Sequence, residues 1–292
     1  MSKIKCSKDG VEPYLFVLPF VISFVLFFMI PSVYSFVLSF YKYNGYSNAA
    51  FVGFKNYIRI LGYWHFWESF ANTLIFYLGH IIPAFVIPFL LALALSSQKT
   101  KFKGLYQTLV FLPNIVSLVA SALVFRILLG TRSGVINAVL GTHIPFLEDA
   151  FYMKLSVISL MVWHGFGWFF IVFLAGLTMV GAELKEAAAI DGAKPYQVIW
   201  YITIPVMRPV FLFALVMDMI TTLKLFVEPQ LLLGTSSNAK TIPQAGDTII
   251  TLLYDNLNNG VYGTASAIGW ILFLIILGVS IFQFRVLQAK GE

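Results

Sequence analysis

Five long stretches of this chain contain no charged residue: residues 13–41, 69–98, 104–125, 155–182 and 256–284. A helix rises ~1.5 Å per residue, so ~20 apolar residues are enough to cross the ~30 Å hydrocarbon core of a bilayer. A sixth stretch, residues 209–233, is interrupted by Asp218, Lys224 and Glu228 but is otherwise apolar and long enough to cross. The sequence therefore predicts an all-α, polytopic membrane protein with six transmembrane helices.

The composition agrees with a membrane protein and argues against several soluble classes. Hydrophobic residues make up 59% of the chain and charged residues 11%, and the mean hydropathy of +0.86 lies outside the range of soluble domains. The net charge of +6 comes from lysines and arginines at the ends of apolar runs, which favours membrane topology over nucleic-acid binding.

Cys6 is the only cysteine, so no intrachain disulfide is possible, and we expect no metal site. The N-terminal run lacks a signal-type cleavage site, so we expect a retained helix.

The placement of basic residues predicts how the helices are oriented. Lysine and arginine are most frequent in the two tails and in the second and fourth breaks between apolar runs, which places both termini in the cytoplasm. We divide the chain into an N-terminal tail (1–12), a first transmembrane helix (13–41), an aromatic-rich outer interfacial segment (42–71), a core of five helices (72–286) and a C-terminal tail (287–292). Asn72 and Thr73 are expected to open the second helix.

A polar insert, residues 181–209, breaks the apolar pattern and is predicted to face the cytoplasm. Residues 184–191 contain acidic residues followed by good helix formers, which predicts a short helix. Gly192 is expected to end it in a left-handed turn, and Pro195 to open a second helix over residues 196–201. The insert is thus predicted to form a helix-turn-helix whose small alanine surface allows close approach of a partner and whose acidic residues can pair with an arginine there.

The spacing within the insert resembles the EAA loop of the permease subunits of binding-protein-dependent ABC importers. The pattern is Glu186-Ala187-Ala188, three residues, Gly192, nine residues, and then Ile202-Thr203-Ile204-Pro205, with Ile204 in place of the usual leucine. Shorter matches, Phe51-Val52-Gly53-Phe54-Lys55-Asn56-Tyr57 among them, are similar to the carbohydrate-uptake branch on its MalF-like and UgpA-like side. One departure is Gly234-Thr235-Ser236-Ser237, where that family usually has Gly-Gly-Pro.

The resemblance implies a type I ABC importer permease in a bacterial or archaeal cell membrane. It implies a second homologous permease, two ATPase subunits, an extracytoplasmic solute-binding protein and a sugar substrate as partners, and no nucleic acid. ATP and Mg would be used by the ATPase, with no cofactor bound by this chain. Because no Gly-Lys dipeptide occurs, the chain has no P-loop of its own. The ATPase-coupling residues implied are Glu186, Ala187, Ala188, Asp191, Gly192, Ala193, Ile202 and Pro205.

Ionisable residues inside apolar runs are costly and are candidates for function. His164 is predicted near the membrane midplane between aromatic residues that suit stacking on a sugar ring, and Asp218 shares a helix face with Thr221 and Thr222. The candidate substrate-path residues are Trp163, His164, Trp168, Asp218, Thr222 and Lys224, although helix packing would explain the same residues.

One residue pair and one histidine have a structural interpretation. Lys224 and Glu228 are expected to form an i, i+4 ion pair, and His80, just before Pro83, to satisfy a kinked backbone or a neighbouring helix.

Two other functions are compatible with the sequence. A proton-coupled secondary transporter would use His164, Asp218 and Glu228 as a relay. A membrane enzyme or signalling protein is the second alternative, but the histidines are scattered and neither H-E-x-x-H nor G-x-S-x-G occurs, so we expect no enzyme activity in this chain.

Overall fold

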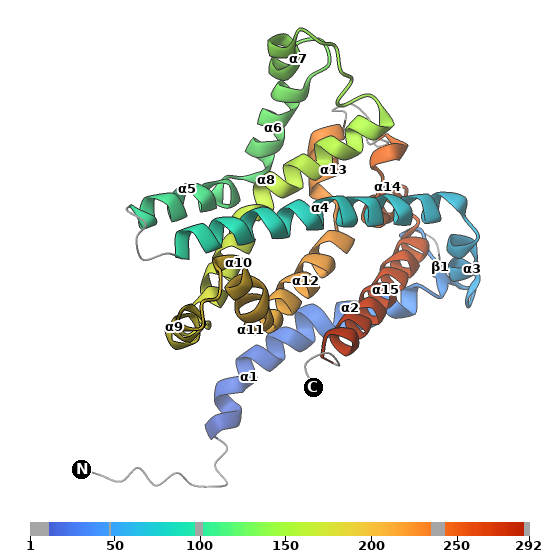
Figure 1. The fold of residues 1–292 in the computed structure, drawn as a ribbon. Coiled ribbons are helices and arrows are strands. Elements are labelled where there is room, and N and C mark those ends of the chain that lie inside the picture. Colours follow the sequence, from blue (N-terminus) through green and yellow to red (C-terminus); the bar gives the residue numbers. More distant parts are fainter. Residues whose placement is uncertain (1–11, 47, 97–101, 235–242, 289–292) are drawn as a thin grey trace.

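A computed structural model describes residues 12–46, 48–96, 102–234 and 243–288. Most of the predicted N-terminal tail, with Cys6, and most of the Gly234-Thr235-Ser236-Ser237 departure lie outside these ranges, as does the end of the C-terminal tail. Figure 1 shows helices packed around two long central ones, α4 (Trp64–Ser96) and α8 (Ala150–Leu177), with α1 (Glu12–Phe24) projecting away from the bundle.

The predicted all-helical membrane fold is confirmed. Among the described residues, four helices are long and apolar enough to cross a bilayer: the first, Tyr14–Leu38, then α4, α8 and α15 (Tyr262–Gln288). Two bent pairs bring the number to six if each pair is one span. The first helix consists of α1, the π-helical turn η1 (Val25–Met29) and α2 (Ile30–Leu38). Its apolar side chains are exposed, Phe16 to 86% and Phe27 to 81%, as expected for a surface that faces lipid or another protein.

The segment after the first helix differs from the prediction. The helix ends at Leu38, and the chain forms a short antiparallel pair of strands, β1 (Tyr41–Lys42) and β2 (Ala50–Phe51), followed by α3 (Lys55–Leu61). The second membrane helix, α4, begins at Trp64 and not at Asn72. Asn72 lies inside α4 and does not cap it. Its side-chain amide instead donates to the backbone oxygens of Gln244 and Asp247, at 3.0 and 3.1 Å.

The third apolar run is not one straight helix. It forms α5 (Lys103–Ile115) and α6 (Leu118–Leu129), which meet at 88°. The break falls at Val116 and Ser117, both in extended conformation, with ψ of 136° and 131°. Pro113 lies just before it and cannot donate a backbone hydrogen bond. Beyond α6, the short helix α7 (Val135–Leu140) leads to α8.

The stretch over residues 209–233 is also interrupted, and this changes one predicted contact. Helix α12 (Arg208–Leu223) ends before Lys224, and α13 (Val227–Leu233) starts after Phe226. Because residues 224 and 228 are not on one continuous helix, their side chains do not share a face. The predicted Lys224–Glu228 ion pair is wrong: the two side chains, both in the described part of the chain, do not pair with each other. The turn η3 (Gln244–Gly246) and α14 (Ile249–Asn258) then precede α15.

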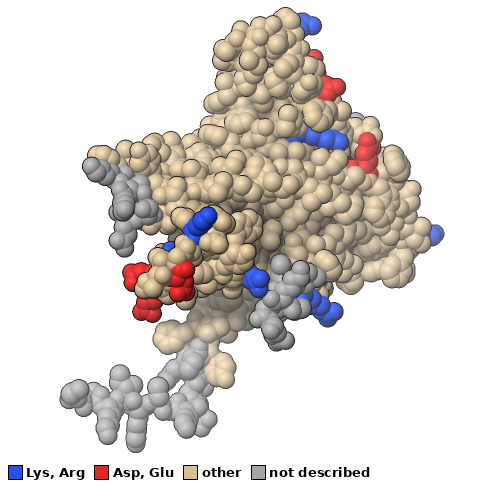
Figure 2. Space-filling model, in the orientation of Figure 1, with Lys and Arg blue, Asp and Glu red and all other residues tan. Residues whose placement is uncertain are grey.

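The core is built mainly where α4 and α8 cross. Phe76 of α4 and Phe170 and Phe173 of α8 are fully buried, and neighbouring rings contact them edge to face, such as Phe85 on Phe173 with ring centroids 5.3 Å apart. Gly167 allows the close approach of α5 to α8, since a Cβ there would lie 3.1 Å from the Cα of Phe111. The visible surface in Figure 2 carries few charges across the body of the bundle, consistent with a membrane environment.

Candidate functional site: an exposed insert and two cavities

The insert begins with a short helix that a glycine terminates. Helix α9 (Ala182–Ile190) ends in a pair of backbone hydrogen bonds: Ala193 N–H donates to Ala188 O at 2.9 Å, and Gly192 N–H to Ala189 O at 3.1 Å. These two bonds define a Schellman motif, which places Gly192 at the position that needs a left-handed backbone. Its φ is +77°. The predicted left-handed turn at Gly192 is therefore confirmed.

The second helix of the insert is longer than residues 196–201. It runs from Pro195 to Val206 through α10 (Pro195–Val198), the π-helical turn η2 (Ile199–Thr203) and α11 (Ile204–Val206), and meets α12 at 66°. The helix start is capped because the Gln197 side chain accepts from Lys194 N–H at 2.7 Å. Pro205 lies in the last turn of this helix, one residue before its end at Val206.

The insert presents an acidic and apolar surface at one end of α8. Figure 2 shows acidic side chains gathered over the region where Figure 1 places α9. Glu186, Ala187, Asp191 and Gly192 are exposed, whereas Ala188 is buried. The other predicted coupling residues, Ala193, Ile202 and Pro205, are half-buried, and Ala193 and Ile202 line a hollow of about 340 Å³ between the two helices. The coupling roles of these residues stay predictions.

A second feature is a cavity of about 600 Å³ among α4, the α5–α6 break, α8, α12 and α13. Its polar lining is His80, Asn114, His164, Trp168, Asp218, Thr221, Thr222, Lys224 and Glu228. Five of the six predicted path residues thus meet in one cavity. The sixth, Trp163, is not in this lining, and its ring packs against Phe125 with centroids 5.7 Å apart.

Two of the lining residues hold the α5–α6 break against α8. The Asn114 amide donates to the backbone oxygen of His164 at 3.2 Å, and Nε2 of His164 lies 3.3 Å from the backbone oxygen of Val116. A broken helix in a membrane leaves backbone groups that need partners. His164, predicted near the midplane, therefore stabilises the break together with Asn114, and both residues also line the cavity.

Sequence reasoning missed the pairing of His80 with Asp218. Nδ1 of His80 on α4 lies 3.5 Å from Oδ1 of Asp218 on α12, and the side chains are only 5% and 7% exposed. The sequence interpretation gave His80 a backbone or packing role. The sequence did contain a signal, since a histidine and an aspartate stand in two separate apolar runs. Only the packing of α12 on α4 brings them together.

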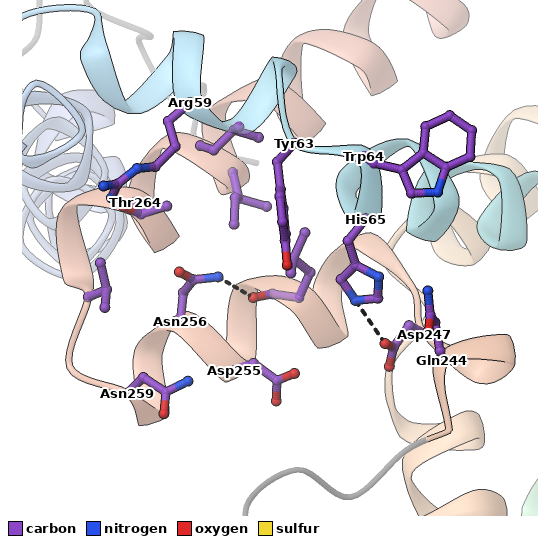
Figure 3. Close-up of a pocket in the computed structure, with 14 residues that line it drawn as sticks. Arg59, Tyr63, Trp64, His65, Gln244, Asp247, Asp255, Asn256, Asn259 and Thr264 are labelled. Carbon is purple, nitrogen blue, oxygen red and sulfur yellow. Dashed lines mark hydrogen bonds and ion pairs between the residues drawn. The ribbon is translucent and has the colours of Figure 1, made fainter.

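A larger cavity, about 1150 Å³, lies at the end of α4 where the helix begins (Figure 3). It is lined by aromatic, amide and charged residues from α3, α4, η3, α14 and α15: Arg59, Tyr63, Trp64, His65, Gln244, Asp247, Asp255, Asn256, Asn259 and Thr264. Because η3 packs on the start of α8 and the insert follows the end of α8, this cavity and the insert lie at opposite ends of the bundle. The sequence analysis did not predict it.

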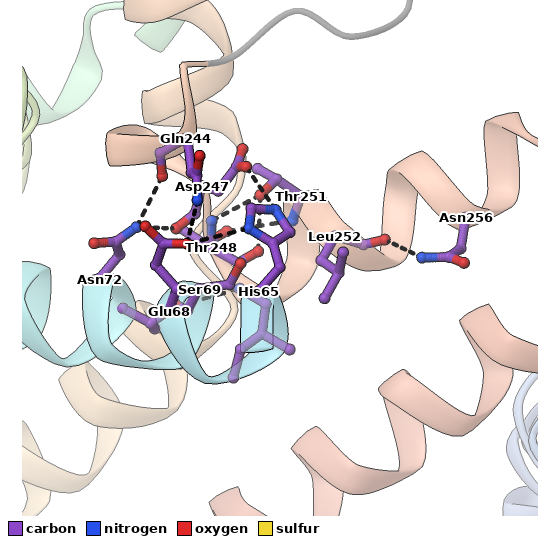
Figure 4. Close-up of polar contacts among 12 residues, drawn as sticks. His65, Glu68, Ser69, Asn72, Gln244, Asp247, Thr248, Thr251, Leu252 and Asn256 are labelled. Atoms are coloured by element: carbon purple, nitrogen blue, oxygen red, sulfur yellow. Dashed lines mark hydrogen bonds and ion pairs between the residues drawn. The ribbon is translucent and has the colours of Figure 1, made fainter. Parts of the chain in front are cut away.

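A polar network beside this cavity ties the start of α4 to the segment before α14 (Figure 4). Nε2 of His65 pairs with Oδ2 of Asp247 at 3.0 Å, while Nδ1 of His65 lies 3.4 Å from Glu68, which also accepts a hydrogen bond from Gln244. Burial raises the pKa of the Asp247 carboxyl to about 6, a shift that His65 opposes and the nearby Asp255 reinforces.

Comparison with known proteins agrees with this architecture. Residues 59–290 match the family of binding-protein-dependent transport system inner membrane components. The arabinooligosaccharides transport system permease protein AraP of Halalkalibacterium halodurans is 32% identical over 98% of this chain and 91% of its own length. The lactose transport system permease protein LacF of Rhizobium radiobacter is 30% identical over 96% and 95%.

The fold has a close counterpart among solved structures. A chain of the bacterial alginate ABC transporter, solved in complex with an alginate pentasaccharide-bound periplasmic protein, superposes with a TM-score of 0.83. It is 26% identical, and the match covers 96% of this chain and 95% of that one. Family match, relatives and fold agree over nearly the whole chain, and the family resemblance is confirmed. The chain therefore belongs to the binding-protein-dependent transport system inner membrane components, and it is a permease subunit of that class.

Proposed function

We propose that this chain is one membrane-spanning subunit of an ATP-driven sugar importer. The 600 Å³ cavity is the part of the sugar path that this chain contributes, and the insert is the surface through which a separate ATPase drives the change of access. The observation that carries the proposal is the arrangement of these two features. A polar, aromatic cavity lies between the long apolar helices, and α12, which lines it, follows the second helix of the insert across a 66° bend.

That connection supplies the mechanical link. Movement of the insert would be transmitted through α12 to Asp218 and Thr222 in the cavity wall, because α12 is a rigid helix of 16 residues. Glu186 is exposed on α9, where its carboxylate can pair with a basic group in a cleft of the ATPase, and the small surface of Ala187 beside it allows close approach.

The proposal includes partners and an orientation. The insert and both termini face the cytoplasm of a bacterial or archaeal cell, a second homologous permease completes the path, and two ATPase subunits bind ATP and Mg. A solute-binding protein delivers the sugar at the opposite end, where the 1150 Å³ cavity opens. The names of the relatives support a sugar as cargo, since they include transporters of arabinooligosaccharides and lactose.

Charge reversal in α9 tests the docking surface. Glu186→Lys is expected to abolish sugar-stimulated ATPase activity of the assembled complex in vesicles, because it replaces an attraction with repulsion at the contact. Glu183→Lys is the matched control: Glu183 is also exposed on α9 but lies in its first turn, outside the motif, and should retain most of the stimulation.

Two outcomes would contradict the proposal. Full stimulation in Glu186→Lys would remove the docking assignment. Uptake of arabinotriose or lactose that persists without any ATPase and stops with a proton uncoupler would instead indicate a secondary transporter.

A further inference from the structure

We infer that the cargo is an uncharged sugar and that Asp218, positioned by His80, selects it by accepting a hydrogen bond from a sugar hydroxyl. This inference rests on the proposed function, because it names the cargo class of the same cavity. The hydrogen bonds that the cavity wall already makes, and a buried carboxyl oxygen of Asp218 without a partner, support it.

Several polar groups in the wall already have partners within the protein. Asn114 donates to the backbone oxygen of His164, and the His164 ring lies against the backbone oxygen of Val116. The Thr221 hydroxyl donates to the backbone oxygen of Met217 at 2.9 Å. A ligand that used these groups would have to break bonds that hold the wall together, so they are poor candidates for recognition.

Asp218 differs from these residues. Its side chain is only 7% exposed and lines the cavity, and its Oδ2 has no hydrogen-bond partner among the described residues. A buried carboxyl oxygen without a donor is energetically costly. Oδ2 itself is buried, so a ligand hydroxyl reaches it when the Asp218 side chain rotates toward the cavity. Donation to Oδ2 then removes that cost and forms a charge-assisted hydrogen bond.

His80 holds the carboxyl group in place. Its Nδ1 lies 3.5 Å from Oδ1 of Asp218, so the imidazole occupies the side of the carboxyl group opposite to the unpartnered oxygen. The ring is fixed by packing: its centroid lies 6.1 Å from that of Phe169, and Nε2 faces Gly165, where a Cβ would be 3.7 Å away. His80, on α4, is therefore a positioning residue that contacts α8 and α12 and leaves Oδ2 as the carboxyl oxygen available to a ligand.

The charges of the wall disfavour an anionic cargo. Asp218 and Glu228 are two carboxyl groups against the single lysine, Lys224. A sugar acid close to Oδ2 would bring like charges together in a low-dielectric site, whereas a neutral sugar supplies hydroxyl donors. Trp168 and Phe169 supply aromatic faces for the apolar side of a sugar ring.

The test is equilibrium dialysis of radiolabelled sugars against the purified complex of permease and ATPase subunits. The probes are arabinotriose and lactose as neutral sugars and digalacturonate as the acidic one. The wild type should bind at least one neutral sugar and bind digalacturonate at least about tenfold more weakly. Asp218→Asn should weaken neutral-sugar binding by about 10- to 100-fold, the range for one hydrogen bond to a charged group, and should reduce the discrimination against digalacturonate.

Two further variants separate recognition from damage to the fold. His80→Leu should weaken neutral-sugar binding, and His80→Gln should recover part of it, because the glutamine amide is a polar group that can donate to the Asp218 carboxyl group. Glu183→Gln makes the same change from a carboxylate to an amide on α9, outside both cavities, and should leave the affinity unchanged within about twofold.

The inference is overturned if Asp218→Asn binds neutral sugars as tightly as the wild type, or if the wild type prefers digalacturonate. Those results would leave the importer assignment intact, provided that sugar still stimulates the ATPase. Failure of the proposed function has a different signature, in which no sugar delivered by the solute-binding protein is taken up or stimulates ATP hydrolysis by the wild type.

Discussion

Replacement of Gly192 by alanine would test whether the conformation of the insert, and not only its charge, controls docking of the ATPase. Gly192 has φ of +77°, and a Cβ built there would meet no atom within 4 Å. The substitution therefore adds no clash. It changes only the energy of the left-handed backbone that the Schellman motif at the end of α9 requires.

The magnitude follows from the backbone alone. A residue with a Cβ pays about 1–2 kcal/mol to adopt the left-handed conformation, and about 1.4 kcal/mol corresponds to a factor of ten. The population of inserts with the observed turn should fall by about 5- to 30-fold relative to inserts with a rearranged turn. If docking needs the observed turn, the apparent Kd for the ATPase should rise by up to the same factor.

The assay is binding of purified ATPase subunits to the permease complex in lipid nanodiscs, followed by biolayer interferometry. Gly181→Ala is the matched control, because Gly181 opens α9 at φ of −54° and also has no atom within 4 Å of a built Cβ. It should bind within about twofold of the wild type. An unchanged Kd for Gly192→Ala, with the protein still intact on size-exclusion chromatography, would refute the reasoning.

Two further predictions concern the opposite end of the bundle. Gly263→Ala should destabilise the detergent-solubilised protein by about 1–3 kcal/mol or more in thermal unfolding, because the new Cβ would collide with the backbone carbonyl of Tyr41, whereas Gly278→Ala on the same helix meets nothing within 4 Å and should cost little. Burial raises the pKa of Asp247 from 3.8 to about 6, so folding favours its protonated form; that stabilisation is complete below pH ~4 and is lost as pH rises through ~6. Asp247→Asn should remove about 1–2 kcal/mol of this pH dependence, after allowance for solvent screening, and equal pH profiles for the two proteins would contradict it.

Local sequence determined the parts of the fold that depend on local physics. The apolar runs predicted membrane helices because burial in lipid depends on composition and length. The turn at Gly192 was predicted because a left-handed backbone strongly favours glycine. The spacing of the insert identified the family because its short helix and turn occupy a fixed length of chain.

Tertiary structure decided the breaks. Pro113 is the one local signal near the 88° bend at Val116, and it does not fix the size of the bend. The broken backbone is tolerated because Asn114 and His164 supply contacts between α5 and α8. Likewise, Asn72 has the sequence character of a helix cap but lies within α4, where it binds backbone oxygens 172 and 175 residues away.

The sequence by itself determined that this chain spans a membrane and carries an insert whose spacing resembles that of a known family. It also supplied most of the polar residues of the cavity, because ionisable groups stand out in apolar runs. Only the tertiary structure decided how those residues are used. It separated Lys224 from Glu228 by ending α12, and it brought His80 to Asp218 by packing α12 against α4. Pairing inside a membrane depends on which helix faces meet, and that is set by the whole bundle and not by spacing along one chain segment.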